Sequence, residues 1–320
     1  MKKFIVIINL LLILILILSG CNNTQTGQIS IAEQYGLAYA PIQIMKEKGF
    51  LKAYDPDLDV KWKQLGNTVA IREAMLAGNV DIGFMAIPPF LIGRDKGMKW
   101  KIINGLNISP LGLVTYKENV DSIDDITVED RIALPQPGSI QHILLAMACE
   151  KRFSNASKFD DILVTMAHPD GMNALLSRKE ITAHFTSPPY IFEELAVGNI
   201  HQILSGKEAM GGEFTFIIGV GTEKFHDNNP ENYQIFVKSL HDAIEFIKQN
   251  PEEAAKILAN KYEISEEKIL KYITWPGMKY TSSIKGVEQF IDFMQKTGYI
   301  NLKYNDISEI SWGEETHDGQ

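Results

Sequence analysis

The residues best suited to chemistry stand at a helix start, in Pro135-Gln136-Pro137-Gly138-Ser139-Ile140-Gln141-His142. A Gly-Ser pair in this position leaves backbone N–H groups free and aligned with the positive end of the helix dipole. The sequence therefore predicts that Gly138, Ser139 and Ile140 hold an oxyanion without a cationic side chain, with His142 close by. Ser139 is equally suited to capping the helix, and the two roles are compatible.

Signatures of catalysis and of metal binding are missing from the sequence. The seven histidines are scattered, and neither a His-x-x-x-His nor a Cys-x-x-Cys spacing occurs. No Gly-x-Ser-x-Gly elbow and no phosphate-binding Walker loop is present. His226 and Asp227 adjoin each other without further ligands nearby in the chain. We therefore expect no enzymatic activity, no metal and no cofactor.

One pattern occurs twice in the chain, and it predicts how the binding residues are positioned. Val80–Phe90 and Ile181–Tyr190 are both apolar runs that end in a double proline, and each follows a short apolar helix and a turn. Proline lacks the N–H that a strand ladder needs, so each strand must end there. Because loops at the carboxyl ends of strands face the ligand crevice in open α/β sheets, the repeat predicts two lobes facing each other across a cleft. The alternative is two unrelated turns.

Five loops should lie at this cleft, and together they contain aromatic and hydroxyl groups but no Lys or Arg. Neutral donors would then bind a polar or anionic group, and the aromatic rings would enclose the apolar part of the ligand. The same rings could instead sandwich a flat heterocycle. The predicted binding residues are Tyr35, Tyr39, Asn67, Thr68, Ala86, Ile87, Phe90, Gly138, Ser139, Ile140, His142, Thr186, Ser187 and Tyr190.

Length and composition are those of an ordinary globular protein with two lobes. The chain has 320 residues, of which 45% are apolar and 22% charged. The net charge of −9 argues against nucleic-acid binding through a broad basic surface. Cys149 lies in an apolar stretch and is expected to be a core residue without a disulfide partner.

The first residues predict export and a lipid anchor. Lys2 and Lys3 precede an apolar run, Phe4–Leu18, that has the length of a signal peptide and is too short for a comfortable membrane span. The run ends in Leu18-Ser19-Gly20-Cys21, which resembles the bacterial lipobox. We expect residues 1–20 to be the lipoprotein signal peptide, Cys21 to be acylated and residues 21–28 to be a tether. An uncleaved membrane anchor is the alternative, but it leaves Cys21 unexplained.

Four short segments of the chain follow one another in an order and at a spacing that are informative together. They are Tyr39-Ala40-Pro41, Lys46–Leu51, Val60-Lys61-Trp62 and Ala74–Gly83. This order and spacing resemble those of the binding proteins for nitrate, sulfonates and taurine, whose relatives also bind the pyrimidine precursor of thiamine. The resemblance runs from about residue 29 to about residue 259.

The resemblance implies a two-lobed α/β fold, the type II periplasmic-binding-protein or Venus-flytrap fold, with the ligand cleft between the lobes. Lobe 1 is expected at residues 29–115 and 217–320, and lobe 2 at residues 116–216. The implied function is capture of a small anionic solute for an ABC permease and its ATPase, by a monomer anchored on the extracytoplasmic face of the cell membrane. Two alternatives stay open, namely a thiamine-precursor binding protein and an exported enzyme or sensor on the same fold.

Overall fold

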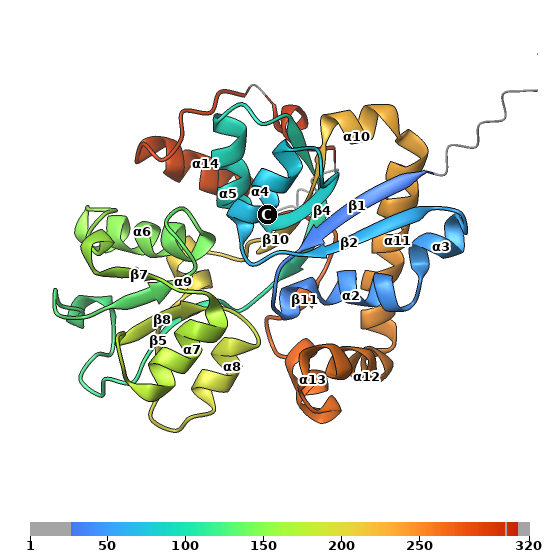
Figure 1. The fold of residues 1–320 in the computed structure, drawn as a ribbon. Helices are drawn as coiled ribbons and strands as arrows, with labels where there is room; N and C mark the ends of the chain where they lie inside the picture. Colours follow the sequence, from blue (N-terminus) through green and yellow to red (C-terminus); the bar gives the residue numbers. More distant parts are fainter. Residues whose placement is uncertain (1–26, 305, 313–320) are drawn as a thin grey trace, which may run out of the picture.

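The computed structural model describes residues 27–304 and 306–312, which form two α/β lobes (Figure 1). Lobe 1 contains a six-stranded sheet in the order β11-β4-β10-β3-β1-β2, and lobe 2 a five-stranded sheet in the order β7-β6-β8-β5-β9. The predicted two-lobed α/β fold is confirmed. The predicted signal peptide and Cys21 lie outside the described residues.

The sheet of lobe 1 is mixed and buried. β1 pairs in parallel with β2 and β3, while β10 runs antiparallel between β3 and β4. The central strands are continuous apolar runs because helices cover both faces of the sheet. The strand bounds are β1 (Gln28–Glu33), β2 (Asp59–Gln64), β3 (Ile82–Ala86), β4 (Trp100–Ile108), β10 (Ile217–Thr222) and β11 (Lys279–Tyr280).

The helices of lobe 1 come from both ends of the chain. The longest, α11, buries one stripe at helical spacing, Phe236, Leu240, Ala243, Ile244 and Ile247. It packs on α2 and α3, which a left-handed Gly49 separates. The bounds are α2 (Ala40–Glu47), α3 (Phe50–Tyr54), α4 (Thr68–Leu76), α5 (Ile87–Asp95), α10 (Glu223–Asn228), α11 (Pro230–Gln249), α12 (Pro251–Tyr262), α13 (Glu266–Ile273) and α14 (Val287–Lys296).

Lobe 2 repeats the plan on a smaller scale. Its strands are β5 (Gly112–Thr115), β6 (Ile132–Leu134), β7 (Leu163–Thr165), β8 (Ala183–Thr186) and β9 (His201–Ser205). Its helices are α6 (Ile140–Phe153), α7 (His168–Ser177), α8 (Tyr190–Leu195) and α9 (Gly206–Met210).

One predicted boundary differs from the structure. Residues 29–115 were assigned to lobe 1, but β5 pairs with β8 and β9 in the sheet of lobe 2. Since β4 belongs to lobe 1 as far as Ile108, we place the first crossing at residues 109–111. Leu113 and Val114 are apolar and fully buried, and such a strand suits either sheet, so the pattern alone could not assign it. The return crossing lies between α9 and β10, at residues 211–216.

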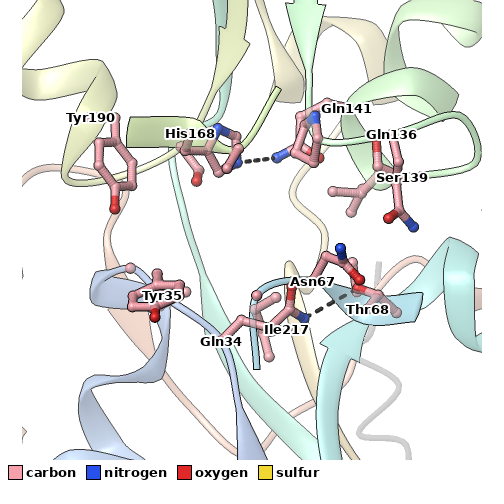
Figure 2. Close-up of a pocket in the computed structure, with 18 of the residues that line it drawn as sticks. Gln34, Tyr35, Asn67, Thr68, Gln136, Ser139, Gln141, His168, Tyr190 and Ile217 are labelled. Carbon is pink, nitrogen blue, oxygen red and sulfur yellow. Dashed lines mark hydrogen bonds between the residues drawn. The ribbon is translucent and has the colours of Figure 1, made fainter. Parts of the chain in front are cut away.

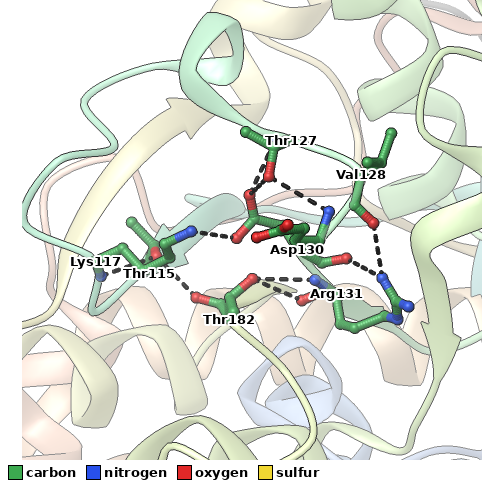
Figure 3. A network of polar contacts seen from close by, with 8 residues as sticks. Thr115, Lys117, Thr127, Val128, Asp130, Arg131 and Thr182 are labelled. Atoms are coloured by element: carbon green, nitrogen blue, oxygen red, sulfur yellow. Dashed lines mark hydrogen bonds and ion pairs between the residues drawn. The ribbon is translucent and has the colours of Figure 1, made fainter.

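A polar network fixes the ends of the lobe 2 strands that lie away from the cleft (Figure 3). Thr115 Oγ1 donates to the Thr182 carbonyl at 2.7 Å, and the Arg131 N–H donates to Thr182 Oγ1 at 3.1 Å. The buried Asp130 carboxylate accepts from Lys117 Nζ at 2.7 Å, and this pairing keeps the pKa of Asp130 below its usual value against the effect of burial. The network joins β5, β6 and β8 and leaves their other ends free to form the cleft.

The predicted repeat is confirmed in both lobes. A helix, a turn and a buried strand recur as α4 with β3 and as α7 with β8. β3 ends at Ala86 and β8 at Thr186, and each double proline follows within three residues. The two strands therefore release the chain at the edges that face each other.

Candidate functional site

A cavity of about 200 Å³ lies between the lobes, and both lobes line it. Figure 2 shows the two walls facing each other, with side chains of lobe 1 opposite side chains of lobe 2. None of the lining residues, all of them in the described part of the chain, is Lys, Arg, Asp or Glu. The lining residues are Gln34, Tyr35, Gly36, Ala38, Tyr39, Gly66, Asn67, Thr68, Ala86, Pro89, Pro135, Gln136, Ser139, Ile140, Gln141, Thr165, Met166, Ala167, His168, Pro169, Ser187, Pro188, Tyr190, Phe216 and Ile217.

The lobe 1 wall is a set of neutral hydrogen-bonding groups. Gln34 follows β1 and donates to Thr68 Oγ1 at 3.1 Å and to the Phe84 carbonyl at 3.2 Å. Asn67 caps α4, because its Oδ1 accepts from the Ala70 N–H at 3.0 Å. Fixed in this way, the Asn67 amide and the Thr68 hydroxyl can donate to a ligand without carrying charge, whereas both N–H groups of the Gln34 amide are already used.

The lobe 2 wall begins at the start of α6. Ser139 is the N-cap, and its Oγ accepts from the His142 N–H at 3.3 Å. The N–H of Gly138 donates to His142 Nδ1 at 3.0 Å, and the N–H of Ser139 donates to the Gln136 carbonyl at 3.1 Å. Two of the three backbone donors predicted for an anion are therefore already used. Within the described chain, the N–H groups of Ile140 and Gln141 have no recorded acceptor, so these two donors remain available.

A chain of polar contacts runs from this wall into lobe 2, in which His168 is half-buried and Gln141, His184 and Glu194 are buried. Gln141 Nε2 lies 3.2 Å from His168 Nε2, and His168 Nδ1 lies 3.3 Å from His184 Nε2. His184 Nδ1 then lies 2.6 Å from Glu194 Oε1, and both of these side chains are fully buried. Gln141, His168, His184 and Glu194 are called the histidine relay below.

Burial sets the charge of the histidine relay. Burial and the neighbouring His184 hold the pKa of His168 well below its usual range. Burial also lowers the pKa of His184 and raises that of Glu194. At neutral pH the four side chains therefore carry no net charge, because a buried charge without a full set of partners is costly.

Contacts between the lobes occur at two places. At one, α8 meets α13, where Glu193 accepts from Lys268 Nζ at 2.6 Å and from Tyr272 Oη at 2.8 Å. At the other, α6 meets α14, where Lys296 Nζ donates to Glu150 Oε1 at 3.0 Å. These contacts join the two lobes outside the residues that line the cavity.

Nine of the fourteen predicted binding residues line the cavity. They are Tyr35, Tyr39, Asn67, Thr68, Ala86, Ser139, Ile140, Ser187 and Tyr190. Their role in binding remains a prediction, but the structure brings them together from five separate segments.

The other five predicted residues do not line the cavity. Ile87 and Phe90 turn into the core of lobe 1, where the Phe90 ring stacks on Trp100 with centroids 5.9 Å apart. Gly138 and His142 are bonded to each other, and His142 packs edge-on against Tyr299. Thr186 is fully buried, 3.4 Å from His168 Nδ1. Their loops reach the cavity, but the side chains of Ile87, Phe90, His142 and Thr186 do not line it, and the Gly138 N–H is used within its own loop.

Several cavity residues were not predicted from the sequence. Gln136 and Gln141 stand within the helix start that was singled out, so their amides could have been included. His168 occupies the first position of α7, as Thr68 does in α4, and the repeat was the available signal. Phe216 and Ile217 come from the return crossing, and no local signal marks them as lining residues.

Comparisons with known proteins agree with this geometry. Residues 26–260 match the NMT1-like family. The chain belongs to the NMT1-like family. It is 23% identical over 330 residues to a Bacillus subtilis (strain 168) protein provisionally named an aliphatic sulfonates-binding protein, and the match covers 97% of this chain and 94% of that one.

Solved structures share the fold of this NMT1-like chain. The periplasmic aliphatic sulphonate binding protein SsuA from Escherichia coli aligns with a TM-score of 0.70 at 18% identity, covering 92% of this chain and 94% of that one. The periplasmic nitrate-binding protein NrtA from Synechocystis PCC 6803 aligns with a TM-score of 0.69 at 14% identity, covering 89% and 85%. The resemblance to ABC-importer binding proteins for nitrate and sulfonates is thereby confirmed, and so is the two-lobed binding-protein fold.

Two further observations concern only the residues that the structure describes. No cluster of three or more His, Cys, Asp or Glu side chains with metal-binding geometry occurs among them. Over the same part of the chain, no helix has both the length and the apolar character needed to span a bilayer.

Proposed function

We propose that this NMT1-like protein is the extracytoplasmic solute-binding lipoprotein of an ABC importer. Its ligand is a small anionic solute of the sulfonate, taurine or nitrate kind, held between the two lobes and delivered to the permease. It acts as a monomer and catalyses no reaction. The observation that carries this proposal is a cavity between two lobes that is lined by neutral donors and aromatic rings.

The donors in the cavity suit an anion with several oxygens. The free N–H groups of Ile140 and Gln141 lie at the start of a 14-residue helix, where the helix dipole favours negative charge. Ser139 contributes a hydroxyl from the same wall, and Thr68 and Asn67 face them from lobe 1 (Figure 2). Tyr39 and Tyr190 would enclose the apolar part of the ligand, and burial raises the pKa of both phenols, so they are neutral donors.

The relatives support the class of ligand. The Bacillus subtilis protein is named for aliphatic sulfonates, and SsuA and NrtA for sulphonate and nitrate. Both named structures are periplasmic binding proteins, which supports an extracytoplasmic location for this chain.

A thermal-shift screen tests the ligand class. Propanesulfonate, taurine, nitrate, bicarbonate and a thiamine-precursor pyrimidine would each be added to the protein, because a ligand that binds only the folded state raises the Tm. We expect the sulfonates to raise the Tm in a concentration-dependent way. A Tm shift with the pyrimidine and with none of the other compounds would show that the ligand is not an anion of the proposed class.

A thiamine-precursor pyrimidine is the second candidate. Tyr35 and Tyr190 lie on opposite walls of the cavity (Figure 2), and Tyr190 stacks on His168 with ring centroids 5.7 Å apart. Such rings can sandwich a flat heterocycle. Two results together would favour this candidate. The wild type would show a Tm shift with the pyrimidine and none with the sulfonates, and Tyr190→Ala would lose the shift with the pyrimidine.

The proposed anchor rests on Leu18-Ser19-Gly20-Cys21 at the end of the apolar run. Cys21→Ala should leave the precursor unprocessed or release the protein from the membrane. Normal cleavage and membrane retention of this variant would refute acylation at Cys21.

A further inference from the structure

The histidine relay is an unusual use of core volume. The His184 and Glu194 side chains are fully buried, and the second carboxyl oxygen, Glu194 Oε2, has no partner in the described chain. Burying these groups costs stability that an apolar pair would not cost. Gly171 of α7 leaves the space they occupy, since a Cβ there would lie 2.6 Å from His184 Nε2. The fold accommodates the pair at a cost, and its position behind the cavity indicates a functional reason.

The hydrogen-bond partners assign a direction to the relay. Gln141 Nε2 is a donor only, so His168 Nε2 accepts and the single proton of His168 sits on Nδ1. His168 Nδ1 therefore donates to His184 Nε2, and His184 Nδ1 donates to Glu194 Oε1. A second proton on His168 would enter at Nε2, on the cavity side, without moving any other proton. Gln141 would turn its amide oxygen toward that proton, or a ligand oxygen would accept it.

A positive charge on His168 would strengthen the binding of an anion in the cavity. Among the lining residues of the described chain, His168 is the only side chain that can become cationic near neutral pH. An anion that enters the cavity loses part of its hydration, and a counter-charge compensates for this loss more fully than neutral donors alone.

Within the described part of the chain, no charged side chain is recorded in contact with His168. Its neighbours are His184 and Thr186 on β8, Gln141 on α6 and Tyr190 on α8. Tyr35 and Tyr39 of lobe 1 line the same cavity. Asp170 of α7 is exposed to solvent, and no contact between its carboxylate and either histidine is recorded.

We propose that anion binding in this cavity takes up one proton on His168, with His184 and Glu194 as positioning residues that hold His168 ready to receive it. This inference rests on the proposed function, because it requires an anionic ligand. The low pKa of the free His168 means that the proton is absent before binding. By linkage, the affinity for an anion should fall about tenfold per pH unit over the range in which uptake occurs.

Isothermal titration calorimetry in buffers of different ionisation enthalpy measures this uptake. Propanesulfonate is the probe, and propanesulfonamide is the matched uncharged control, from about pH 6 to about pH 8. We expect uptake of about one proton with the sulfonate and none with the sulfonamide. Sulfonate binding without uptake overturns the relay and leaves the proposed function intact. Failure of propanesulfonate, taurine and nitrate to bind at any of these pH values overturns the proposed function and this inference with it.

Variants locate the proton. His168→Gln keeps a side chain that can hydrogen-bond to Gln141 but cannot be protonated, so uptake should disappear and the affinity should lose its pH dependence. His201→Gln is the control, because His201 lies on β9 and bonds to the Val120 carbonyl at 2.8 Å, outside the cavity. Uptake that persists in His168→Gln would overturn the assignment of the proton to His168.

A second pair of variants tests the positioning role. Glu194→Leu removes the acceptor of His184 Nδ1, so uptake should require a lower pH. Glu194→Gln keeps a carbonyl oxygen in that place and should restore wild-type uptake. Equal uptake in both variants would contradict a role for Glu194, and far-ultraviolet circular dichroism would verify that each variant is folded.

Discussion

The two lobes build the same helix and strand with opposite distributions of side-chain volume. In lobe 1, β3 carries Gly83 and α4 carries Ile71, and a Cβ on Gly83 would lie 2.6 Å from Ile71 Cγ2. In lobe 2, β8 carries His184 at the corresponding register and α7 carries Gly171. The glycine lies on the strand in lobe 1 and on the helix in lobe 2. The space between helix and strand is filled by the Ile71 side chain in lobe 1 and by the His184 imidazole in lobe 2.

The first strands of the two lobes also differ, and here the polar side chain is in lobe 1. β1 ends in the buried carboxyl of Glu33, which accepts from Gln43 Nε2, whereas β6 ends in the apolar Leu134. Glu33 pairs with Gln64 and Leu134 with Thr165, so the two residues hold matching places in their sheets. Each lobe thus has ionisable side chains buried near the cleft, but on different elements: Glu33 ends β1 in lobe 1, and His184 and Glu194 lie on β8 and α8 in lobe 2. Only the groups in lobe 2 connect to the cavity through recorded hydrogen bonds of the described residues.

This comparison shows that backbone repetition and site chemistry are separable. The matching strand ends place both walls at the cleft, but the lining side chains make the lobe 1 wall neutral and give the lobe 2 wall His168, which can be protonated. Four predictions test this difference, beginning with the largest expected effect.

Glu33 should make stability depend on pH. Burial raises its pKa from 4.5 to about 7, with Lys261 as the largest opposing influence. Because the folded-state pKa lies above the unfolded one, the protonated carboxyl contributes stability below about pH 4.5, and this contribution is lost as the pH rises to about 7. Relative to Glu33→Gln, the free energy of unfolding of the wild type should fall by on the order of 3 kcal/mol across that range. Urea unfolding at a series of pH values measures the difference, and parallel profiles would contradict it.

Gly171→Ala should destabilise the protein although alanine favours helices by about 1 kcal/mol. The new Cβ would displace the ring of His184, and overpacking of this kind typically costs about 1 to 3 kcal/mol. Gly198→Ala is the control, since no atom lies within 4 Å of a Cβ at that position. Chemical denaturation would compare the free energies of unfolding of Gly171→Ala and Gly198→Ala. Equal values would mean that the space beside His184 does not require a glycine at position 171. The double variant Gly171→Ala with His184→Ala should recover part of the loss.

Ser139→Ala should weaken ligand binding by about 1 to 2 kcal/mol, roughly five- to thirtyfold in affinity. The variant removes both the cap of α6 and a hydroxyl in the cavity, but leaves the N–H groups of Ile140 and Gln141 in place. Calorimetry with the ligand from the thermal-shift screen measures it. Ser154→Ala, at the other end of α6, is the control for effects on the helix alone. An affinity of Ser139→Ala within twofold of the wild-type affinity would contradict the assignment of Ser139 to the binding site.

Glu193→Gln should have the smallest effect. It weakens the contact of α8 with Lys268 and Tyr272 across the cleft, and partly exposed ion pairs contribute up to about 1 kcal/mol. We expect a loss of affinity of about fivefold or less and a larger radius of gyration without ligand. Small-angle scattering with and without ligand measures the change. Lys248→Gln, which disrupts an ion pair within α11, should leave the scattering unchanged.

The fold could be predicted from the sequence because its signals are local. The double prolines mark where the chain leaves each sheet, because proline lacks the N–H that a strand ladder needs. The apolar run of β3 and the apolar stripe of α11 indicate which residues are buried. The site could be predicted only in part. Each of the five predicted loops contributes to the cavity lining, but Phe90 turns into the core and Tyr190 into the cavity although both follow a double proline.

The sequence by itself determined the repeat, the two lobes, the neutral character of the binding loops and a family likeness that the comparisons support. Only the tertiary structure decided that β5 belongs to lobe 2 and that the N–H groups of Gly138 and Ser139 already have acceptors. It also decided that His168, His184 and Glu194 contact one another in sequence. The physical reason is distance along the chain. Strand ends and caps depend on neighbours a few residues away, whereas His184 and Gly171, or Gln141 and His168, meet only after two helices and a sheet have packed.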